Sequence, residues 1–195
     1  IKAQYDRPAA GVHDKTIFDH LLKVAPSGET VAEAGNLAEG QNAARFVVEE
    51  TYLNSYVSHA PIEPHAALAR IEGDKATVWA STQTPFALKE AAASLLGIPP
   101  QNVRVIAPFV GGGFGGKSNN RQALEAVRLA KLAGKPVQVA WTRAEEFFYD
   151  TFRPAAVVKI KAGVTEAGLI SLWDYGVYFA GQRGAQHFYN IPHHR

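Results

Sequence analysis

The sequence of 195 residues contains neither cysteine nor methionine. Without cysteine, the chain has no disulfide, no thiolate nucleophile, no thiolate ligand for an iron–sulfur cluster and no cysteine-based zinc site. Any redox chemistry in which the chain takes part must therefore use a bound cofactor. Because the sequence begins with Ile1 and lacks methionine, we expect it to be a fragment of a longer protein.

An excess of charge of one sign is also missing. The sequence has 20 Lys and Arg residues and 18 Asp and Glu residues. The resulting formal net charge of +2 does not favour nucleic acid or an anionic membrane as a partner. No apolar run approaches the roughly 20 residues that a membrane-spanning helix needs, so we expect no membrane span. The remaining composition, 47% hydrophobic and 19% charged, is typical of a globular protein with a buried core.

Periodic patterns predict an α+β fold, with mixed layers of helix and sheet, β-hairpins and one strand–glycine loop–helix unit. Apolar spacing predicts helices over residues 16–24, 84–96, 121–132 and 143–148. β-Branched and aromatic runs predict strands over residues 46–57, 65–73, 75–82, 102–110, 137–141, 157–164 and 169–179. Residues 26–44 are polar and suit a surface connection. We divide the sequence into an N-terminal connecting segment with a short helix (residues 1–45) and a ligand-binding domain (residues 46–195).

The segment Gly111-Gly112-Gly113-Phe114-Gly115-Gly116-Lys117-Ser118 lies between a predicted strand and a predicted helix. Five glycines in six residues cost backbone entropy that an ordinary connection would avoid. They permit positive φ and leave backbone N–H groups uncovered, and the positive end of the next helix is expected beside them. This combination predicts a binding site for an anion.

Two nucleotide-binding patterns fit this glycine loop, and a tight structural turn is a third interpretation. Residues 111–118 match the P-loop pattern, with Asp174 after an apolar run as a candidate metal-holding acid. Gly111, Gly113 and Gly116 also match the dinucleotide-binding pattern G-x-G-x-x-G. That pattern requires an acid after the next strand, where the sequence has Thr142, so the dinucleotide interpretation is disfavoured.

Four further segments accompany the loop in order: HAPIEPH (59–65), STQTPF (81–86), AGKPVQVAWTRAEEF (133–147) and FRP (152–154). Together with FVGGGFGGK (109–117), they resemble the molybdopterin-binding subunit of the xanthine dehydrogenase/aldehyde oxidase family, the molybdenum hydroxylases. The resemblance covers residues 46–182. A P-loop protein would share only one of these five motifs, so P-loop nucleotide binding is the alternative, and a scaffold domain without a ligand is a third hypothesis.

The resemblance implies roles for particular residues. The backbone N–H groups of Gly112 to Gly116 would hold the pterin cofactor, with Phe114 beside the metal and Lys117 merely following the loop. Gln83 would donate from its amide to an oxygen on molybdenum, as a fixed donor to a developing charge does elsewhere. Without the resemblance, Gln83 is equally well interpreted as a buried residue that caps the helix starting at Thr84.

Ser118 departs from the family pattern. Purine-oxidising members carry a glutamate directly after GGFGGK, where it contacts the substrate, so we expect Ser118 to lie near the substrate and do not expect xanthine to be that substrate. An aldehyde or another N-heterocycle is expected instead. The resemblance places the catalytic base, a glutamate, downstream of Arg195, so this chain holds no catalytic residue, no direct metal ligand is expected, and the fragment alone should be inactive.

His59, Glu63 and His65 have the residue types of a zinc site within seven residues. We reject that interpretation because Pro61 and Pro64 interrupt the segment with a bend, and the resemblance implies that it serves as scaffold.

The resemblance also implies cofactors and partners. The cofactor would be molybdenum–molybdopterin in its cytosine dinucleotide form, with iron–sulfur clusters and FAD or haem on partner subunits. The partners would be the remainder of the same large subunit, an iron–sulfur subunit or domain, and a small-molecule substrate, with no nucleic acid and no membrane span.

Overall fold

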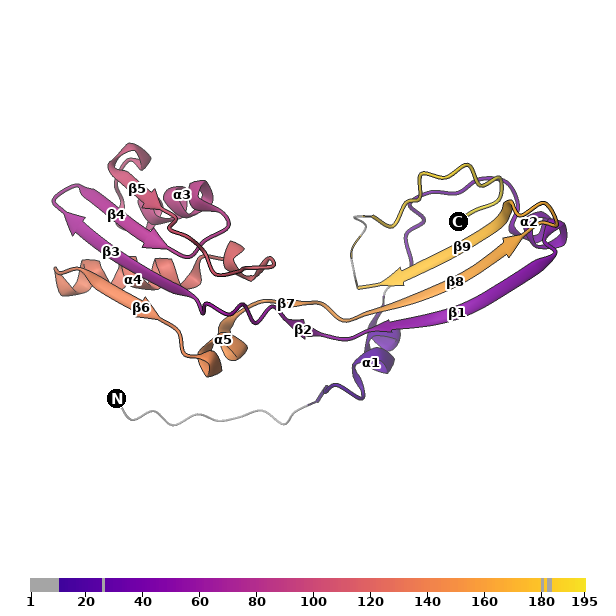
Figure 1. Cartoon of the computed structure of the whole chain (residues 1–195), viewed down its shortest axis with the longest axis horizontal. Helices are drawn as coiled ribbons and strands as arrows, with labels where there is room; N and C mark the ends of the chain where they lie inside the picture. The colour runs from indigo at the N-terminus through magenta and orange to yellow at the C-terminus, as the bar shows by residue number, and fades with distance from the viewer. Residues whose placement is uncertain (1–10, 26, 180, 182–183) are drawn as a thin grey trace. The chain divides into compact units, whose positions relative to one another are not determined.

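The computed structural model describes residues 11–25, 27–179, 181 and 184–195. The chain divides into two compact units, one formed by the segments up to residue 57 and from residue 154 onward, the other by residues 58–153 (Figure 1). The short strands β2 (Val57–Ser58) and β7 (Phe152–Arg153) pair with each other. Among the described residues, no helix has the length and apolar character to cross a membrane. The expected functional boundary after residue 45 stays a prediction.

The first unit is built on a three-stranded antiparallel sheet in the order β1-β8-β9. Its strands are β1 (Phe46–Asn54), β8 (Ala156–Val164) and β9 (Ile170–Tyr178). Helix α1 (Ile17–Val24) contacts β8, and helix α2 (Leu37–Ala43) contacts β8 and β9. The turn between β8 and β9 contains Gly168 at φ +78°, a backbone conformation that favours glycine.

The second unit contains a four-stranded sheet in the order β5-β4-β3-β6. Its strands are β3 (Ala66–Glu72), β4 (Lys75–Ala80), β5 (Val103–Ile106) and β6 (Val137–Ala140). β4 and β5 are parallel and are connected through helix α3 (Pro85–Leu96) and the short helix η1 (Pro100–Asn102), whereas β3 is antiparallel to both of its neighbours. Helix α4 (Arg121–Ala133) leads from the glycine loop to β6.

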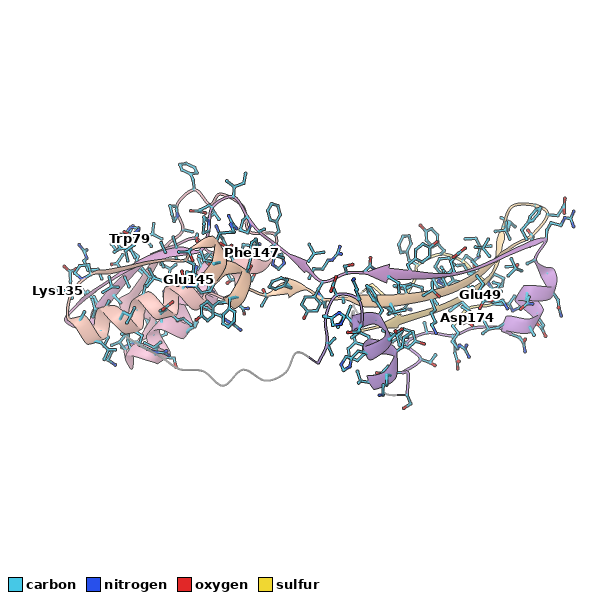
Figure 2. The ribbon with its side chains drawn as sticks, turned by 90° about the horizontal axis from the view of Figure 1, so that it is seen from below. Glu49, Trp79, Lys135, Glu145, Phe147 and Asp174 are labelled. Atoms are coloured by element: carbon cyan, nitrogen blue, oxygen red, sulfur yellow. The ribbon has the colours of Figure 1, made fainter. Side chains whose placement is uncertain are left out.

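Helices α3 and α4 pack together and against the sheet of the second unit (Figure 1). The core between them is rich in alanine, whose small side chains allow helices and strands to approach closely. Its buried members are Ala67, Ala69, Ala76, Val78, Ala80, Leu88, Ala92, Ala93, Val103, Ala123, Ala126, Val127 and Ala130. Helix α5 (Arg143–Tyr149), which carries Glu145 and Phe147 in Figure 2, follows β6.

The α+β class and the hairpins predicted from the sequence are confirmed, but three segments differ. Residues 26–44 were expected to form only a connection, whereas they contain α2, whose N-terminus is capped by the Asn36 side chain. The strand expected over residues 46–57 ends at Asn54, because its partner β8 begins at Ala156. The strand expected over residues 102–110 ends at Ile106, shortly before Pro108, which has no N–H to donate to a sheet.

Candidate functional site

Four strand ends meet at one edge of the second unit's sheet. The parallel strands β4 and β5 both end there, since Trp79 is paired with Ile106. β3 starts and β6 ends at the same edge, where Ala66 lies opposite Ala140. Because the STQ segment follows β4 and the glycine loop follows β5, this topology brings Gln83 to the loop.

The glycine loop has both backbone conformations and close contacts that favour glycine. Gly112 and Gly115 have φ values of +94° and +108°, and Phe114 has φ +55°. At Gly113 an added Cβ would lie 2.5 Å from Gln83 Oε1, closer than atoms can approach. The glycines therefore allow polar side chains to lie directly against the loop backbone.

The backbone N–H groups of the loop fall into two sets. Those of Gly115 and Gly116 donate to Gln83 Oε1 and to the Gly113 carbonyl oxygen, both at 2.9 Å. Those of residues 112–114 have no acceptor in the part of the chain that the structure describes. The N–H groups of residues 112–114 are therefore unpaired, with Gly113 buried, Gly112 half-buried and Phe114 exposed, while the N–H groups of Gly115 and Gly116 hold the loop in shape.

Gln83 is an exposed residue that is fixed at two points. Its backbone N–H donates to the Lys117 carbonyl oxygen at 3.0 Å, and its Oε1 accepts from Gly115. Nε2 has no acceptor among the described residues, so the amide nitrogen can donate to a ligand. The interpretation of Gln83 as a buried helix cap is wrong: Gln83 is exposed, α3 begins at Pro85, and the Gln83 side chain accepts from the loop instead.

Lys117 is completely buried and pairs with a carboxylate. Its Nζ lies 2.6 Å from Glu63 Oε2, and the same oxygen accepts from the Gly111 N–H at 2.8 Å. Burial alone raises the pKa of Glu63, but the hydrogen bonds from Lys117 and Gly111, with the Lys117 charge, lower it below its usual range. A P-loop lysine must reach the phosphates of a nucleotide, and the pairing of Lys117 does not fit that role.

The end of the loop differs from the expected junction with a helix. A single 3-10 turn, η2 (Gly116–Ser118), comes first, and α4 begins only at Arg121. The buried Asn120 adopts φ +56°, accepts a hydrogen bond from the Thr82 hydroxyl and donates to Thr84 Oγ1 at 2.8 Å. The N-terminus of α4 therefore does not directly follow the glycines, and Asn120 joins the loop to the STQ segment.

The two remaining predicted site residues both point a side chain to solvent. Phe114 is 74% exposed, and its ring lies against the Gly112 backbone, 3.3 Å from where a Cβ would be. Ser118 is exposed at the end of η2, and its carbonyl oxygen accepts from Thr84 Oγ1 at 3.0 Å. Both residues belong to the same loop as Gln83's partner Gly115, so the structure brings the predicted site residues together.

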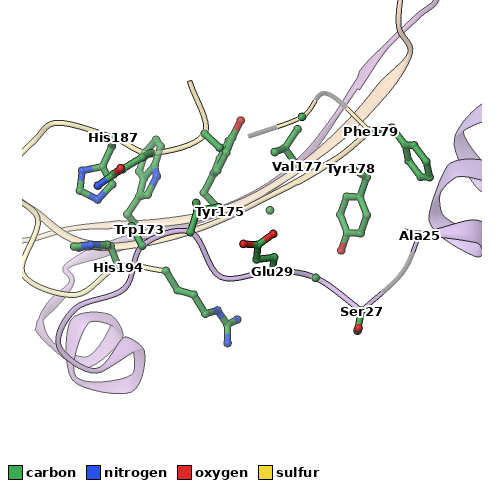
Figure 3. A pocket seen from close by; sticks show the side chains of 18 of the residues that line it. Ala25, Ser27, Glu29, Trp173, Tyr175, Val177, Tyr178, Phe179, His187 and His194 are labelled. Carbon is green, nitrogen blue, oxygen red and sulfur yellow. The ribbon is translucent and has the colours of Figure 1, made fainter. Parts of the chain in front are cut away.

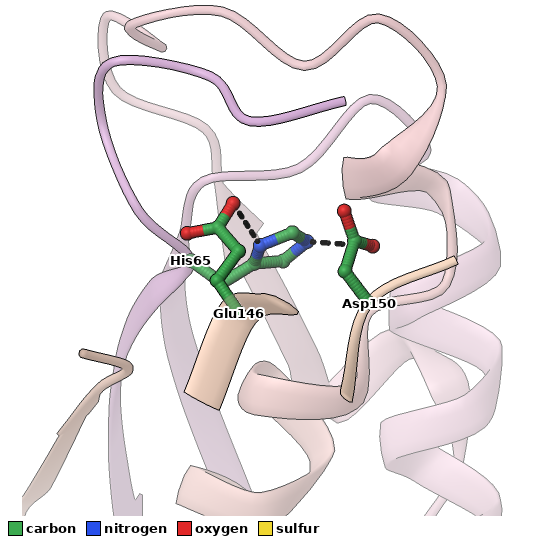
Figure 4. Close-up of side chains that lie close together, drawn as sticks. All are labelled: His65, Glu146 and Asp150. Carbon is green, nitrogen blue, oxygen red and sulfur yellow. Dashed lines mark hydrogen bonds and ion pairs between the residues drawn. The ribbon is translucent and has the colours of Figure 1, made fainter. Parts of the chain in front are cut away.

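His65, Glu146 and Asp150 form a buried charged cluster that the sequence analysis missed (Figure 4), and Asp150 contacts the loop, since a Cβ on Gly116 would lie 2.5 Å from its Oδ2. His65 Nδ1 is 3.1 Å from Glu146 Oε1, and His65 Nε2 is 3.8 Å from Asp150 Oδ1. The two nitrogens of an imidazole point in opposite directions, so these carboxylates flank the ring and do not converge with one nitrogen on a metal ion. Glu146 lies within the segment AGKPVQVAWTRAEEF and Asp150 follows the aromatic run of residues 147–149, but nothing in the sequence indicates that either carboxylate lies beside His65.

His59, Glu63 and His65, the three residues of the rejected zinc pattern, contact different partners. His65 joins Glu146, and Glu63 joins Lys117. His59 Nδ1 lies 2.8 Å from the Thr151 carbonyl oxygen.

The first unit contains a separate pocket of about 700 Å³ (Figure 3). Trp173, Tyr175 and Tyr178 of β9 line it, together with Glu29 and His194. None of the residues predicted for the cofactor site lines this pocket.

Comparisons with known proteins show which family the chain belongs to. The family described as molybdopterin cofactor-binding domain matches residues 23–189. The chain is 36% identical over 172 residues to the aldehyde oxidoreductase molybdenum-binding subunit PaoC of Escherichia coli K12, covering 88% of this chain and 23% of that protein. It is 34% identical over 137 residues to the probable hypoxanthine oxidase XdhD of the same organism, covering 70% and 14%.

A solved structure shows the same fold. The aldehyde oxidoreductase from Desulfovibrio gigas superposes with a TM-score of 0.72 over 84% of this chain and 20% of that chain, at 22% sequence identity. The chain thus spans less than a quarter of the length of these relatives. The match over residues 23–189 shows that the chain belongs to the molybdopterin cofactor-binding domain family of molybdenum-containing oxidoreductases.

Proposed function

We propose that this chain binds molybdenum–molybdopterin within an oxidoreductase that hydroxylates an aldehyde or an N-heterocycle with oxygen from water. The observation that carries the proposal is the row of unpaired N–H groups at residues 112–114 beside the Gln83 amide. When bound, the cofactor supplies the redox-active metal. The chain itself has no cysteine thiolate that could hold an iron–sulfur cluster.

The residues present fit an anionic pterin cofactor. Consecutive N–H groups in a loop with positive φ form a concave donor site, as the backbone does at other phosphate and sulfur-containing groups. Positive φ at Gly112 and Phe114 gives residues 112–114 that kind of backbone. Gly113 cannot carry a side chain because Gln83 Oε1 occupies the space where a Cβ would lie. Glycine at this position is therefore what allows Gln83 to approach the loop.

Gln83 would orient an oxygen at the metal. Its Oε1 is held by the Gly115 N–H at 2.9 Å, which fixes the plane of the amide and directs Nε2 away from that bond. A donor whose position is set in advance stabilises negative charge without reorganisation. This chain's contribution is therefore to bind and orient, and we propose that the general base, a glutamate, comes from another part of the large subunit.

We propose an aldehyde or an N-heterocycle other than xanthine as the substrate. Ser118 offers a hydroxyl where a purine-oxidising enzyme would offer a carboxylate, and it is exposed at the end of the loop. The relative PaoC, named as an aldehyde oxidoreductase subunit, supports an aldehyde.

The finer form of the cofactor and the partners are also proposals. We propose the cytosine dinucleotide form of molybdopterin and a partner subunit with iron–sulfur clusters and FAD or haem. The name of PaoC as a molybdenum-binding subunit supports a multi-subunit enzyme.

The test is metal and pterin analysis of the enzyme that contains this chain, purified with its partners. We expect stoichiometric molybdenum and a fluorescent oxidised pterin, and a strong reduction of both in Gln83→Ala. Absence of molybdenum, combined with a thermal shift by Mg-ATP that Lys117→Ala abolishes, would support the P-loop alternative instead. Absence of molybdenum, pterin and nucleotide binding would support the scaffold hypothesis.

A further inference from the structure

His59 lies directly against the glycine loop. Its side chain is 14% exposed, and Nε2 is 3.4 Å from the position that a Cβ on Gly115 would take. Nδ1 is 2.8 Å from the Thr151 carbonyl oxygen, which can only accept, so Nδ1 carries a hydrogen. That bond sets the orientation of the ring, whose Nδ1 lies 3.0 Å from where a Cβ on Gly116 would be, and it leaves Nε2 as the nitrogen without a partner.

Asp150 supplies negative charge behind this ring. Its side chain is 1% exposed, and Oδ2 lies 3.6 Å from His59 Nδ1 without a hydrogen-bond partner. A Cβ on Gly116 would lie 2.5 Å from the same oxygen, so the carboxylate also contacts the loop backbone. Asp150 therefore lies against both the His59 ring and the loop, and it helps to hold the ring in place.

Nε2 of His59 has no hydrogen-bond partner among the residues that the structure describes. It lies beside Gly115, next to the unpaired N–H groups of residues 112–114, which we have proposed to hold an anion. With its hydrogen on Nδ1, the imidazole donates to the Thr151 carbonyl oxygen and offers Nε2 as an acceptor beside the loop.

We propose that His59 is a further cofactor-binding residue, whose Nε2 accepts a hydrogen bond from an N–H group of the molybdopterin held by the loop. This inference rests on the proposed function of the chain. A packing role would need only the bulk of the ring and the Nδ1 bond to Thr151, whereas cofactor binding depends on Nε2.

Two substitutions separate these roles in the holoenzyme. His59→Asn places an amide nitrogen near the position of Nδ1 and can keep the bond to Thr151, but it removes Nε2. His59→Gln places its terminal amide, with an oxygen that can accept, near the position of Nε2 and gives up Nδ1. We expect His59→Asn to lose molybdenum and pterin about tenfold faster on dialysis, as for loss of one hydrogen bond, and His59→Gln to retain most of both.

The opposite ranking, with His59→Asn retaining the cofactor and His59→Gln losing it, would show that Nδ1 alone matters and would overturn the proposal. Equal retention in both variants would overturn it as well. Wild-type enzyme without molybdenum would instead refute the proposed function itself, independently of the variants.

A second measurement decides the matter if the variants fail to fold. Diethyl pyrocarbonate modifies an accessible imidazole nitrogen, and peptide mass mapping reports the modification residue by residue. We expect His59 to be modified in cofactor-depleted wild-type protein and to be protected several-fold in the holoenzyme, with His20 of the first unit equally reactive in both. Equal modification of His59 in the two forms would contradict the proposal.

Discussion

Lys117 Nζ lies 2.6 Å from Glu63 Oε2, although the Lys117 side chain is entirely buried and Glu63 is 34% exposed. The pair joins the segment that precedes β3 to the end of the glycine loop. Because the same Glu63 oxygen accepts from the Gly111 N–H at 2.8 Å, one carboxylate balances the buried ammonium and holds the start of the loop. The lysine that suggests a phosphate-binding motif in the sequence is therefore part of the loop's support.

Removing the charge of Glu63 should destabilise the chain more than removing the charge of Lys117. Glu63→Gln leaves the buried ammonium of Lys117 without a counter-charge, and we expect the free energy of unfolding to fall by about 3 kcal/mol. Lys117→Met replaces the ammonium by an apolar group of similar length and should cost less. Denaturant unfolding of the 195-residue chain measures both effects.

The double variant Glu63→Gln/Lys117→Met provides the control. Because it contains no buried charge at this position, it should be more stable than Glu63→Gln alone. Equal free energies of unfolding for Glu63→Gln and the double variant would show that the charges of Glu63 and Lys117 are not energetically coupled.

Acid should weaken the same contact. The folded-state pKa of Glu63 lies below its ordinary value of 4.5, so the stability that the ionised carboxylate contributes is fully present above that value. It is lost as the pH falls through the lowered folded-state pKa. The stability difference between wild type and Glu63→Gln should therefore be constant above pH 4.5 and shrink below it. Unfolding at a series of pH values tests this, and a difference that grows on acidification would contradict the contact.

Gly113→Ala should damage the site through Gln83. The new Cβ would lie 2.5 Å from Oε1, so the Gln83 side chain must leave its bond to the Gly115 N–H. We expect molybdenum content of the holoenzyme to fall several-fold. Gly11→Ala is the matched control, since nothing lies within 4 Å of a Cβ there, and it should leave molybdenum content unchanged.

Adding Gln83→Ala to Gly113→Ala distinguishes a steric effect from general misfolding. The double variant removes the clash, so its thermal stability should recover relative to Gly113→Ala. Its molybdenum content should stay low because the amide donor is lost. Recovery of molybdenum together with stability would mean that Gln83 does not bind the cofactor.

The sequence predicts most of the fold and which residues come together at the candidate site, for identifiable reasons. Strand and helix periodicity place the STQ segment after β4 and the glycine loop after β5, and the parallel pairing of these strands brings Gln83 and Gly115 within hydrogen-bond distance. Helix α2 was missed because LAEGQNA contains Gly40 and Asn42, residues of low helix propensity, and it is stabilised by the Asn36 cap and by contact with β9.

The supporting charges behind the loop could not be predicted from the sequence. Lysine is rarely buried without a partner, and nothing in the order of residues shows that Lys117 faces Glu63. Asp150 stands alone after an aromatic run, and its relation to His59 and Gly116 arises only from the return of the chain after α5. Contacts of this kind depend on tertiary structure, whereas the glycines that permit them are visible in the sequence.

Thr142 is expected to stabilise helix α5, which carries Glu146 of the buried His65–Glu146–Asp150 cluster. Its Oγ1 accepts from the Glu145 N–H at 3.2 Å, and Glu145 Oε2 accepts from the Thr142 N–H at 2.7 Å, a reciprocal cap at the start of α5. The hydrogen bonds from the Thr142 N–H and hydroxyl also lower the pKa of Glu145. Helix α5 in turn places Glu146 beside His65, with Asp150 following directly after its last residue.

Thr142→Ala should lower the free energy of unfolding by about 1 kcal/mol, the typical cost of losing a helix cap. Because α5 leads directly into Asp150, whose Oδ2 contacts the glycine loop at Gly116, the variant should also release molybdenum from the holoenzyme faster than wild type does. Thr30→Ala, at an exposed threonine outside the helices and strands, should change neither quantity. Loss of stability without any change in the rate of molybdenum release would show that the buried cluster does not support the cofactor loop.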